Sequence, residues 1–241
     1  MIKNKYMLKK KYKGMTLIEV LFSTAIFSFV AITLFALFKL GQTYWAKGIA
    51  YNTLQSEGKR ILTLLQQDIK ESDINRDSVY TYNTSVNNIF VGSQNVRRDG
   101  LLLSVPNPNP NPHPLTYRAY IATNEINDNK GGTGSLYLLE FNPTSATGYD
   151  TTWSSIDSNL KGLFNNDGFS NNELSNLSDP RPIRVSLLSD NLFSFEAHRS
   201  INTISISVLL VRKSFSDQKL QSVRFDLEIA PANNEQFPFN N

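Results

Sequence analysis

Residues 9–38 read KKKYKGMTLIEVLFSTAIFSFVAITLFALF. From Val20 to Phe38 the chain contains no charged residue, no glycine and no proline. A helix of this length would be about 29 Å long, which is close to the thickness of a bilayer's hydrocarbon core. Lysines precede the apolar run, so the charge asymmetry predicts a cytoplasmic N-terminus and a chain that continues on the other side of the membrane.

The boundary between the basic and the apolar segment carries two unusual residues, Gly14 and Glu19. A secretory signal places its small-residue cleavage site after the apolar run, whereas Gly14 comes before it. Glu19 lies five residues after that glycine, at the start of the apolar segment. A charge at the centre of a membrane helix costs about 2.5–3.5 kcal/mol, so this carboxylate is expected to have a partner.

The sequence from Gly14 to Val20, followed by the apolar run, resembles the signal of type IV pilins and of type II secretion pseudopilins. The resemblance implies that a prepilin peptidase cleaves after Gly14 and that the new N-terminal residue, Met15, is N-methylated. It also implies that Glu19 pairs with the N-terminal amine of a neighbouring subunit during assembly. The first mature residue is commonly Phe in this family, and Met15 departs from that. The alternative is a plain signal anchor with an unrelated glutamate.

Charge and cysteine content limit the class of protein. The formal net charge is +3, but residues 1–14 contain six lysines and no acid, so removing them changes it to −3. The basic character therefore belongs to the leader and does not indicate a nucleic-acid-binding protein. The chain has no cysteine. A domain outside the cytoplasm would thus fold without disulfides, and a thiol nucleophile is excluded.

A helical pattern continues after the apolar run. Apolar or small residues recur at helical spacing and form one stripe: Tyr51, Leu54, Gly58, Ile61, Leu62, Leu65 and Ile69. We therefore expect one helix from Met15 to about Ser72. Residues 15–40 would form its transmembrane and assembly half, and residues 41–72 its amphipathic half.

The remaining residues, 73–241, are expected to form a β-rich domain, so the predicted fold class is α+β with the helix packed on an antiparallel sheet. The stretch from Asp73 to Gly100 is polar and is expected to be irregular, with a short strand at 89–91. Apolar alternation predicts strands at Leu101–Val105, Leu115–Ala122, Leu136–Phe141, Ile183–Leu188, Leu192–His198, Thr203–Arg212 and Ser222–Ile229.

Three connections between these strands have distinctive sequences. Alternating prolines from Pro106 to Pro114 predict an extended loop. The sequence Ser189-Asp190-Asn191 predicts a turn between two strands. Residues 142–181 form a long polar insert, in which a short helix is expected around Trp153 to Phe164, and inserts of this length are commonly functional or mobile.

The order of strands and turns in the C-terminal third is similar to that of J-type pseudopilins and W-type minor pilins. The helix segment Leu62–Ile69 is similar to theirs as well. This second resemblance implies a low-copy subunit that primes or caps a filament.

No convergent set of catalytic residues is apparent, and an enzyme is not expected. The two histidines, His113 and His198, have no metal-ligand neighbour at helical spacing and are interpreted as surface residues. An irregular calcium site of Asp167, Glu173 and backbone carbonyls is one alternative, although the spacing does not fit an EF-hand. The remaining basic residues are interpreted as solvated surface: Arg97, Arg98, Arg181, Arg184, Arg212, Lys213, Lys219 and Arg224.

We therefore expect a minor pilin or pseudopilin that is a structural subunit without a cofactor. Its expected partners are a prepilin peptidase, other pilins through the N-terminal helix, an inner-membrane assembly platform and, before assembly, membrane lipid. The expected location is the bacterial cytoplasmic membrane, with a single span and the C-terminal domain outside, and then the filament. Two alternatives stay open: a competence pilin that binds DNA, and an adhesive or polysaccharide-export pilin.

Overall fold

The computed structural model describes residues 15–73, 76–88, 92–107, 115–141, 149–166, 168–177 and 181–231. The predicted leader 1–14, the predicted strand 89–91 and most of the proline-rich loop, including His113, lie outside the described residues. The chain divides into two compact units, Met1–Trp45 and Ala46–Asn241.

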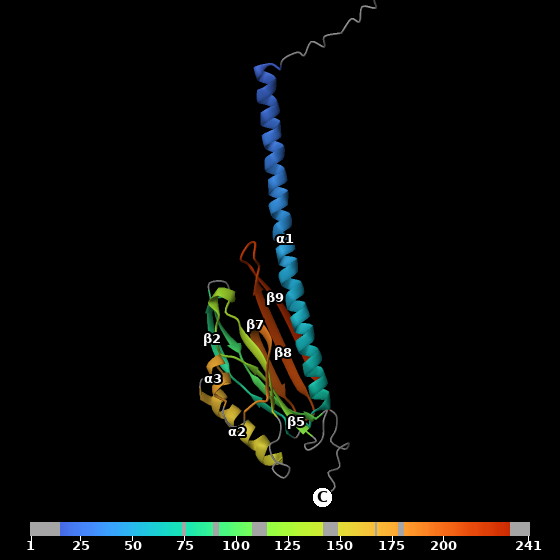
Figure 1. Cartoon of the computed structure of the whole chain (residues 1–241), viewed down its shortest axis with the longest axis vertical. Coiled ribbons are helices and arrows are strands. Elements are labelled where there is room, and N and C mark those ends of the chain that lie inside the picture. The colour runs from blue at the N-terminus through green and yellow to red at the C-terminus, as the bar shows by residue number, and fades with distance from the viewer. Residues whose placement is uncertain are drawn as a thin grey trace, which may run out of the picture. The chain divides into compact units, whose positions relative to one another are not determined.

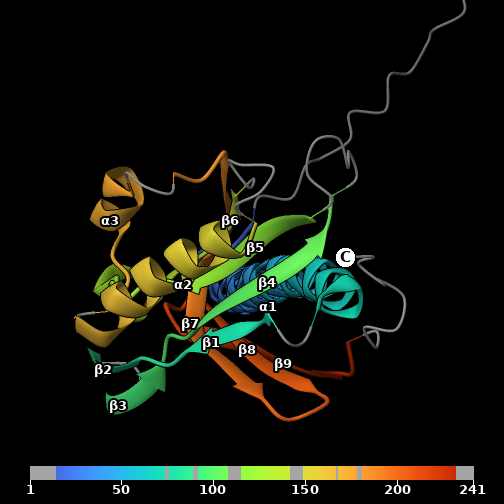
Figure 2. The same ribbon diagram turned by 90° about the horizontal axis from the view of Figure 1, so that it is seen from below.

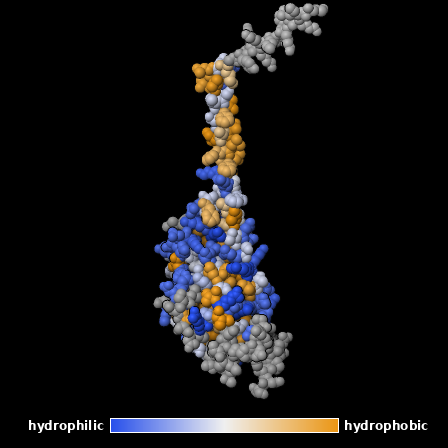
Figure 3. Space-filling model, in the orientation of Figure 1, coloured by the Kyte–Doolittle hydropathy of each residue, from blue (hydrophilic) through white to orange (hydrophobic). Residues whose placement is uncertain are grey.

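In its described residues, the first unit contains the N-terminal part of helix α1 (Leu17–Glu71). The predicted helix from Met15 to Ser72 is thus confirmed to within two residues at each end. Among the described residues, α1 is the helix that is long and apolar enough to cross a membrane, by length and composition. Its most apolar stretch has no buried part, and Figure 3 shows hydrophobic side chains gathered along it.

The second unit contains a seven-stranded antiparallel sheet in the order β1-β4-β5-β6-β7-β8-β9 (Figure 1). Its strands are β1 (Ser78–Tyr80), β4 (Gly100–Pro106), β5 (Leu115–Ala122), β6 (Gly134–Phe141), β7 (Arg184–Arg199), β8 (Ile204–Lys213) and β9 (Leu220–Ile229). A separate hairpin pairs β2 (Asn83–Asn88) with β3 (Gly92–Arg97). The predicted α+β fold is confirmed.

The part of α1 in the second unit packs on the concave face of this sheet. Figure 2 shows the sheet curling around the helix, with β4 and β5 on one side and β8 and β9 on the other. Leu54, Ile61, Leu65 and Ile69 are fully buried there, so most of the predicted stripe is confirmed. Tyr51 is exposed instead, because the stripe continues toward the N-terminus through Ala50 and Ala46.

The opposite face of the sheet is covered by helix α2 (Tyr149–Asn166), which lies inside the predicted insert. Ile156, Leu160 and Phe164 are buried in a second cluster with residues of β4, β5 and β6. The ring of Phe164 stacks on Tyr80 with 5.4 Å between centroids, and Trp153 contacts Tyr117 at 5.3 Å. The described part of the insert is therefore a packed core element, and β5 is buried on both faces.

Two predictions about the strands are wrong. Residues 184–199 form one continuous strand, β7, so Ser189-Asp190-Asn191 is not a turn. Its polar side chains are used within the strand, because the Ser189 hydroxyl and the Asn191 amide both donate to Glu57 of α1. The stretch from Asp73 to Gly100 is not irregular, since it supplies β1, β2 and β3.

The core also contains charged groups that the apolar pattern does not reveal. Asp68 of α1 is buried and accepts hydrogen bonds of 2.5 Å from both Tyr120 and Arg118 of β5. Burial raises the pKa of Asp68 although both partners oppose the shift. Because both partners lie on β5, this cluster fixes the rotation of α1 about its axis and its position along that axis relative to β5.

Arg98 was expected on the surface but is fully buried. Its guanidinium donates to the backbone carbonyls of Leu192 at 2.7 Å and Gly132 at 3.2 Å. Burial lowers the pKa of Arg98 to about 10. Arg97, also expected to be solvated, pairs with buried Asp99 at 2.5 Å. Arg98 thus joins the β3–β4 connection to β7, whereas the Arg97–Asp99 pair lies within that connection, where Asp99 also accepts from the N–H of Ala197 in β7 at 2.9 Å.

A further buried carboxylate, Asp77, lies between the end of α1 and the sheet. It accepts from the Ser72 hydroxyl at 2.8 Å and, at 3.4 Å, from the backbone N–H of Ser104. Burial raises the pKa of Asp77 to about 7, against the opposing effects of these bonds and of Arg199.

Gly58 and Gly48 provide a matched test of helix packing. A Cβ at Gly58 would lie 1.9 Å from the ring of Phe225, whereas a Cβ at Gly48 would meet nothing within 4 Å. Gly58→Ala should therefore destabilise the domain by about 1–3 kcal/mol through overpacking. Gly48→Ala should stabilise it by up to about 1 kcal/mol through helix propensity. Denaturant unfolding of each full-length variant in detergent measures the change in the free energy of unfolding. Equal changes for the two variants would contradict the close contact between Gly58 and Phe225.

The raised pKa of Asp77 predicts that the free energy of unfolding depends on pH. Its pKa is about 7 in the folded chain against 3.8 for an ordinary carboxyl, so the folded state binds the proton more tightly. Stability should therefore fall as the pH rises from about 4 to about 7, by on the order of 4 kcal/mol from this group. Asp77→Asn should remove this part of the pH dependence, since an amide can accept from Ser104 and donate to Ser72. Denaturant unfolding of the unsubstituted chain and of Asp77→Asn across this pH range measures the difference. If the free energy of unfolding changes with pH in the same way for both chains, the raised pKa of Asp77 is refuted.

Candidate assembly and processing site

The predicted site residues Met15 and Glu19 lie at the N-terminus of α1, and Gly14 lies outside the described residues. The Glu19 carboxylate accepts through Oε2 from the Thr16 backbone N–H at 2.9 Å and from the Thr16 hydroxyl at 3.0 Å. The Glu19 N–H donates back to the Thr16 hydroxyl at 3.3 Å. This reciprocal arrangement is a capping box, which satisfies N–H groups that the first helical turn leaves without partners.

The capping box was not predicted, although the sequence contains its signal. A Thr followed three residues later by Glu, directly before an apolar helix, is the pattern of such a cap. The pattern gives Glu19 a role within its own chain, in addition to the predicted pairing with another subunit. Within the chain the carboxylate is already hydrogen-bonded and lies at the favourable end of the helix dipole.

The capping box leaves the charge of Glu19 without a counter-charge. Among the described residues, no Lys, Arg or His forms an ion pair with it. The bonds from Thr16 reach Oε2, and a carboxylate has lone pairs for about four donors. The group can therefore keep its cap and still accept an external cation such as a terminal ammonium.

The helix behind this cap has a surface suited to lipid or to like helices. The large hydrophobic residues of residues 15–40 are all exposed within the chain. Three of its hydroxyl groups donate to the helix backbone: Thr24 to Leu21, Ser28 to Thr24 and Thr33 to Val30. These polar groups therefore need no water, as the interior of a membrane requires.

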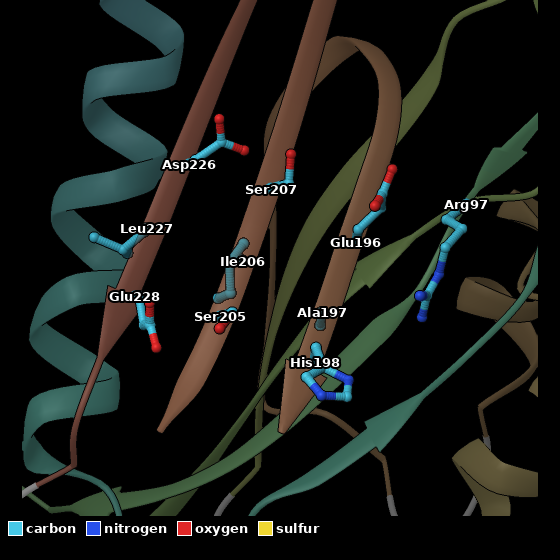
Figure 4. A pocket seen from close by; sticks show the side chains of 10 residues that line it. All are labelled: Arg97, Glu196, Ala197, His198, Ser205, Ile206, Ser207, Asp226, Leu227 and Glu228. Atoms are coloured by element: carbon cyan, nitrogen blue, oxygen red, sulfur yellow. The ribbon is translucent and has the colours of Figure 1, made fainter. Parts of the chain in front are cut away.

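A second candidate site is a hollow of about 350 Å³ on the solvent face of β7, β8 and β9 (Figure 4). The strand register aligns Glu196, Ser207 and Asp226 in one row across the sheet, and His198, Ser205 and Glu228 in the next. The Ser207 hydroxyl and the Arg224 guanidinium lower the pKa of Asp226. The acidic lining is unfavourable for a phosphate backbone.

The described residues do not form a cluster of metal-ligating side chains. No group of three or more His, Asp or Glu side chains within them is arranged to hold a metal ion. His198 is exposed on β7, as predicted for a surface histidine. Glu173 instead accepts from the Ser170 N–H at 2.5 Å, at the start of helix α3 (Asn171–Asn176). Asp167 lies outside the described residues, so the calcium site stays a prediction.

Comparison with known proteins supports the N-terminal motif. A family model described as the prokaryotic N-terminal methylation motif matches residues 9–35. Neither a curated protein nor a solved structure matches the chain. The motif implies processing by a prepilin peptidase and assembly with other pilins, and together with the apolar helix it fits anchoring in a membrane. The motif is of the type IV pilin and pseudopilin type, and the fold, a long apolar helix with an antiparallel sheet domain, is consistent with a pilin-like fold.

Proposed function

We propose that this chain is a minor pilin or pseudopilin, a structural subunit that primes or caps a type IV pilus or a type II secretion pseudopilus. The observation that carries the proposal is the matched N-terminal methylation motif on a helix whose apolar half is exposed on all sides. A side chain surface of this kind is stable in lipid and equally stable in a bundle of like helices. The resemblance of the helix segment Leu62–Ile69 to J-type and W-type subunits supports the low-copy role over the bulk subunit, whereas the resemblance of the strand order is weakened by the continuous strand β7.

The proposed cycle follows from these surfaces. The chain is held in the cytoplasmic membrane with residues 46–231 outside the cytoplasm, and cleavage after Gly14 frees the amine of Met15. An assembly platform then moves the helix from lipid into the filament, so its apolar surface stays buried throughout. The carboxylate of Glu19 accepts the amine of a neighbouring subunit and thereby sets the axial register between the two helices.

Processing can be tested by the intact mass of the membrane-extracted protein. The expected result is loss of residues 1–14 and addition of one methyl group at Met15. Gly14→Val should leave the leader attached, because the residue before the cleaved bond is then larger. An intact leader on the unsubstituted chain, in cells with an active prepilin peptidase, would contradict the proposed processing.

Two substitutions separate the cap from the charge at Glu19. Glu19→Gln keeps an acceptor for the capping box but removes the charge, because Gln serves in such boxes as well as Glu. Thr16→Val removes the hydroxyl of the box but leaves the carboxylate. We expect Glu19→Gln to be inserted, cleaved and stable but absent from filaments, and Thr16→Val to be incorporated, with a helix end weaker by about 0.5–2 kcal/mol.

Recovery of each variant in sheared filaments, relative to the membrane fraction, measures incorporation. Crosslinking between cysteines placed at Met15 and at Ile18 would report the contact between neighbours directly. Normal incorporation of Glu19→Gln would show that the charge has no role in assembly. Failure of Thr16→Val alone would assign the defect to the helix cap.

A further inference from the structure

We propose that the tip of the β8–β9 hairpin, residues 212–219, is a membrane-contact surface that binds the anionic headgroup layer of the membrane holding residues 20–38. The proposal rests on the proposed function for the insertion of α1. It is argued from the exposure, rigidity and charge of the hairpin tip, which lie in the second unit, and from the length of helix α1 between Phe38 and Lys47.

An aromatic side chain projects from the tip. Phe215 is 69% exposed. The other described phenylalanines of the second unit belong to the buried clusters or pack against them. The guanidinium of Arg212 lies 5.8 Å from the centre of its ring. An aromatic ring beside a cationic group combines an apolar body with a charged edge, which is the composition favoured at a membrane interface.

The loop that presents this ring is held in place by hydrogen bonds. Ser214 is buried and its N–H donates to the Lys219 carbonyl at 2.9 Å, while the Gln218 N–H donates to the Ser214 carbonyl at 3.2 Å. The Lys219 N–H also donates to the carboxylate of Asp217 at 3.2 Å. Gln218 adopts a positive φ of 58°, which costs energy for a residue other than glycine. The hydrogen-bonded conformation of the loop therefore holds Phe215 in its exposed position.

The charge of the tip suits an anionic surface. Residues 212–219 contain Arg212, Lys213 and Lys219 and one acid, Asp217. The Asp217 carboxylate is neutralised by Lys47 of α1, with 2.9 Å between Nζ and Oδ2. Each basic residue near an anionic lipid surface contributes about 1 kcal/mol, so Arg212 and Lys219 favour such a surface.

The ion pair with Lys47 also limits how far the tip can be from the membrane. Lys47 comes nine positions after Phe38, the last residue of the uncharged run. Whatever the angle between the two units, a helical stretch of that length spans about 14 Å, of which the headgroup layer takes about 5–8 Å. The remaining distance is comparable to the reach of an aromatic side chain.

Tryptophan fluorescence can locate the tip. The chain has two tryptophans, so Trp45→Phe and Trp153→Phe provide a background without them. Phe215→Trp then places one fluorophore, the tip probe, on the hairpin. Ile201→Trp supplies the matched control probe, because Ile201 is 88% exposed and lies at the other end of β8. Ten residues of strand separate these two ends by about 33 Å.

Both full-length chains are reconstituted in vesicles of phosphatidylcholine brominated near the top of its acyl chains, with and without phosphatidylglycerol. We expect quenching of the tip probe well above that of the control probe, a blue-shifted emission of the tip probe, and an increase of both effects with phosphatidylglycerol. Lys219→Gln should weaken the binding of the tip about fivefold, as expected for one basic residue at an anionic surface.

Quenching of the tip probe no greater than that of the control probe would overturn the proposal. So would a blue shift of the tip probe that occurs only in assembled filaments, since the tip would then contact a neighbouring subunit. Flotation of the chains with the vesicles reports insertion separately. A chain that fails to float would count against the proposed function, whereas one that floats with an unquenched tip probe would refute the membrane-contact surface alone.

Discussion

The structure depends on one helix that must bury apolar surface in two different ways. The large hydrophobic residues from Val20 to Phe38 lie on all sides of the helix and are exposed within the described part of the chain, so their burial requires lipid or other helices. From Ala46 on, burial is confined to one stripe, and the curled sheet supplies its partner. The change from an all-round surface to a stripe coincides with the boundary between the two units at Trp45 and Ala46.

The sheet is held on this helix by charges as well as by apolar contacts. A helix with a plain apolar stripe could slide or turn on a plain apolar sheet at little cost. Asp68 prevents this because its carboxylate, buried against Tyr120 and Arg118, is satisfied in one position only. Glu57 acts similarly at another turn of the helix, where it accepts from Ser189 and Asn191 of β7.

The periodicity of the sequence predicted the helix, its stripe and most strands, because local patterns of burial determine those elements. It could not predict the buried roles of Asp68 and Arg98, since the partners that make their burial tolerable come from distant strands. Ser189-Asp190-Asn191 has the composition of a turn, but its groups bond across to α1 within a continuous strand. At the site, Gly14, Met15 and Glu19 were predicted from the motif, and the cap with Thr16 was overlooked although its spacing was visible.

The packing of α1 also has a consequence for the order of events during synthesis. The stripe of α1 ends at Ile69, but the cluster that buries it includes residues of β8 and β9 as far as Ile229. At about 5–20 residues per second, the ribosome needs about 10–30 s to make the intervening chain. During that interval Leu54, Ile61 and Leu65 are present without the strands that cover them in the finished domain. A chain that emerges helix first and closes its sheet last thus depends on something else to shield this stripe while translation continues.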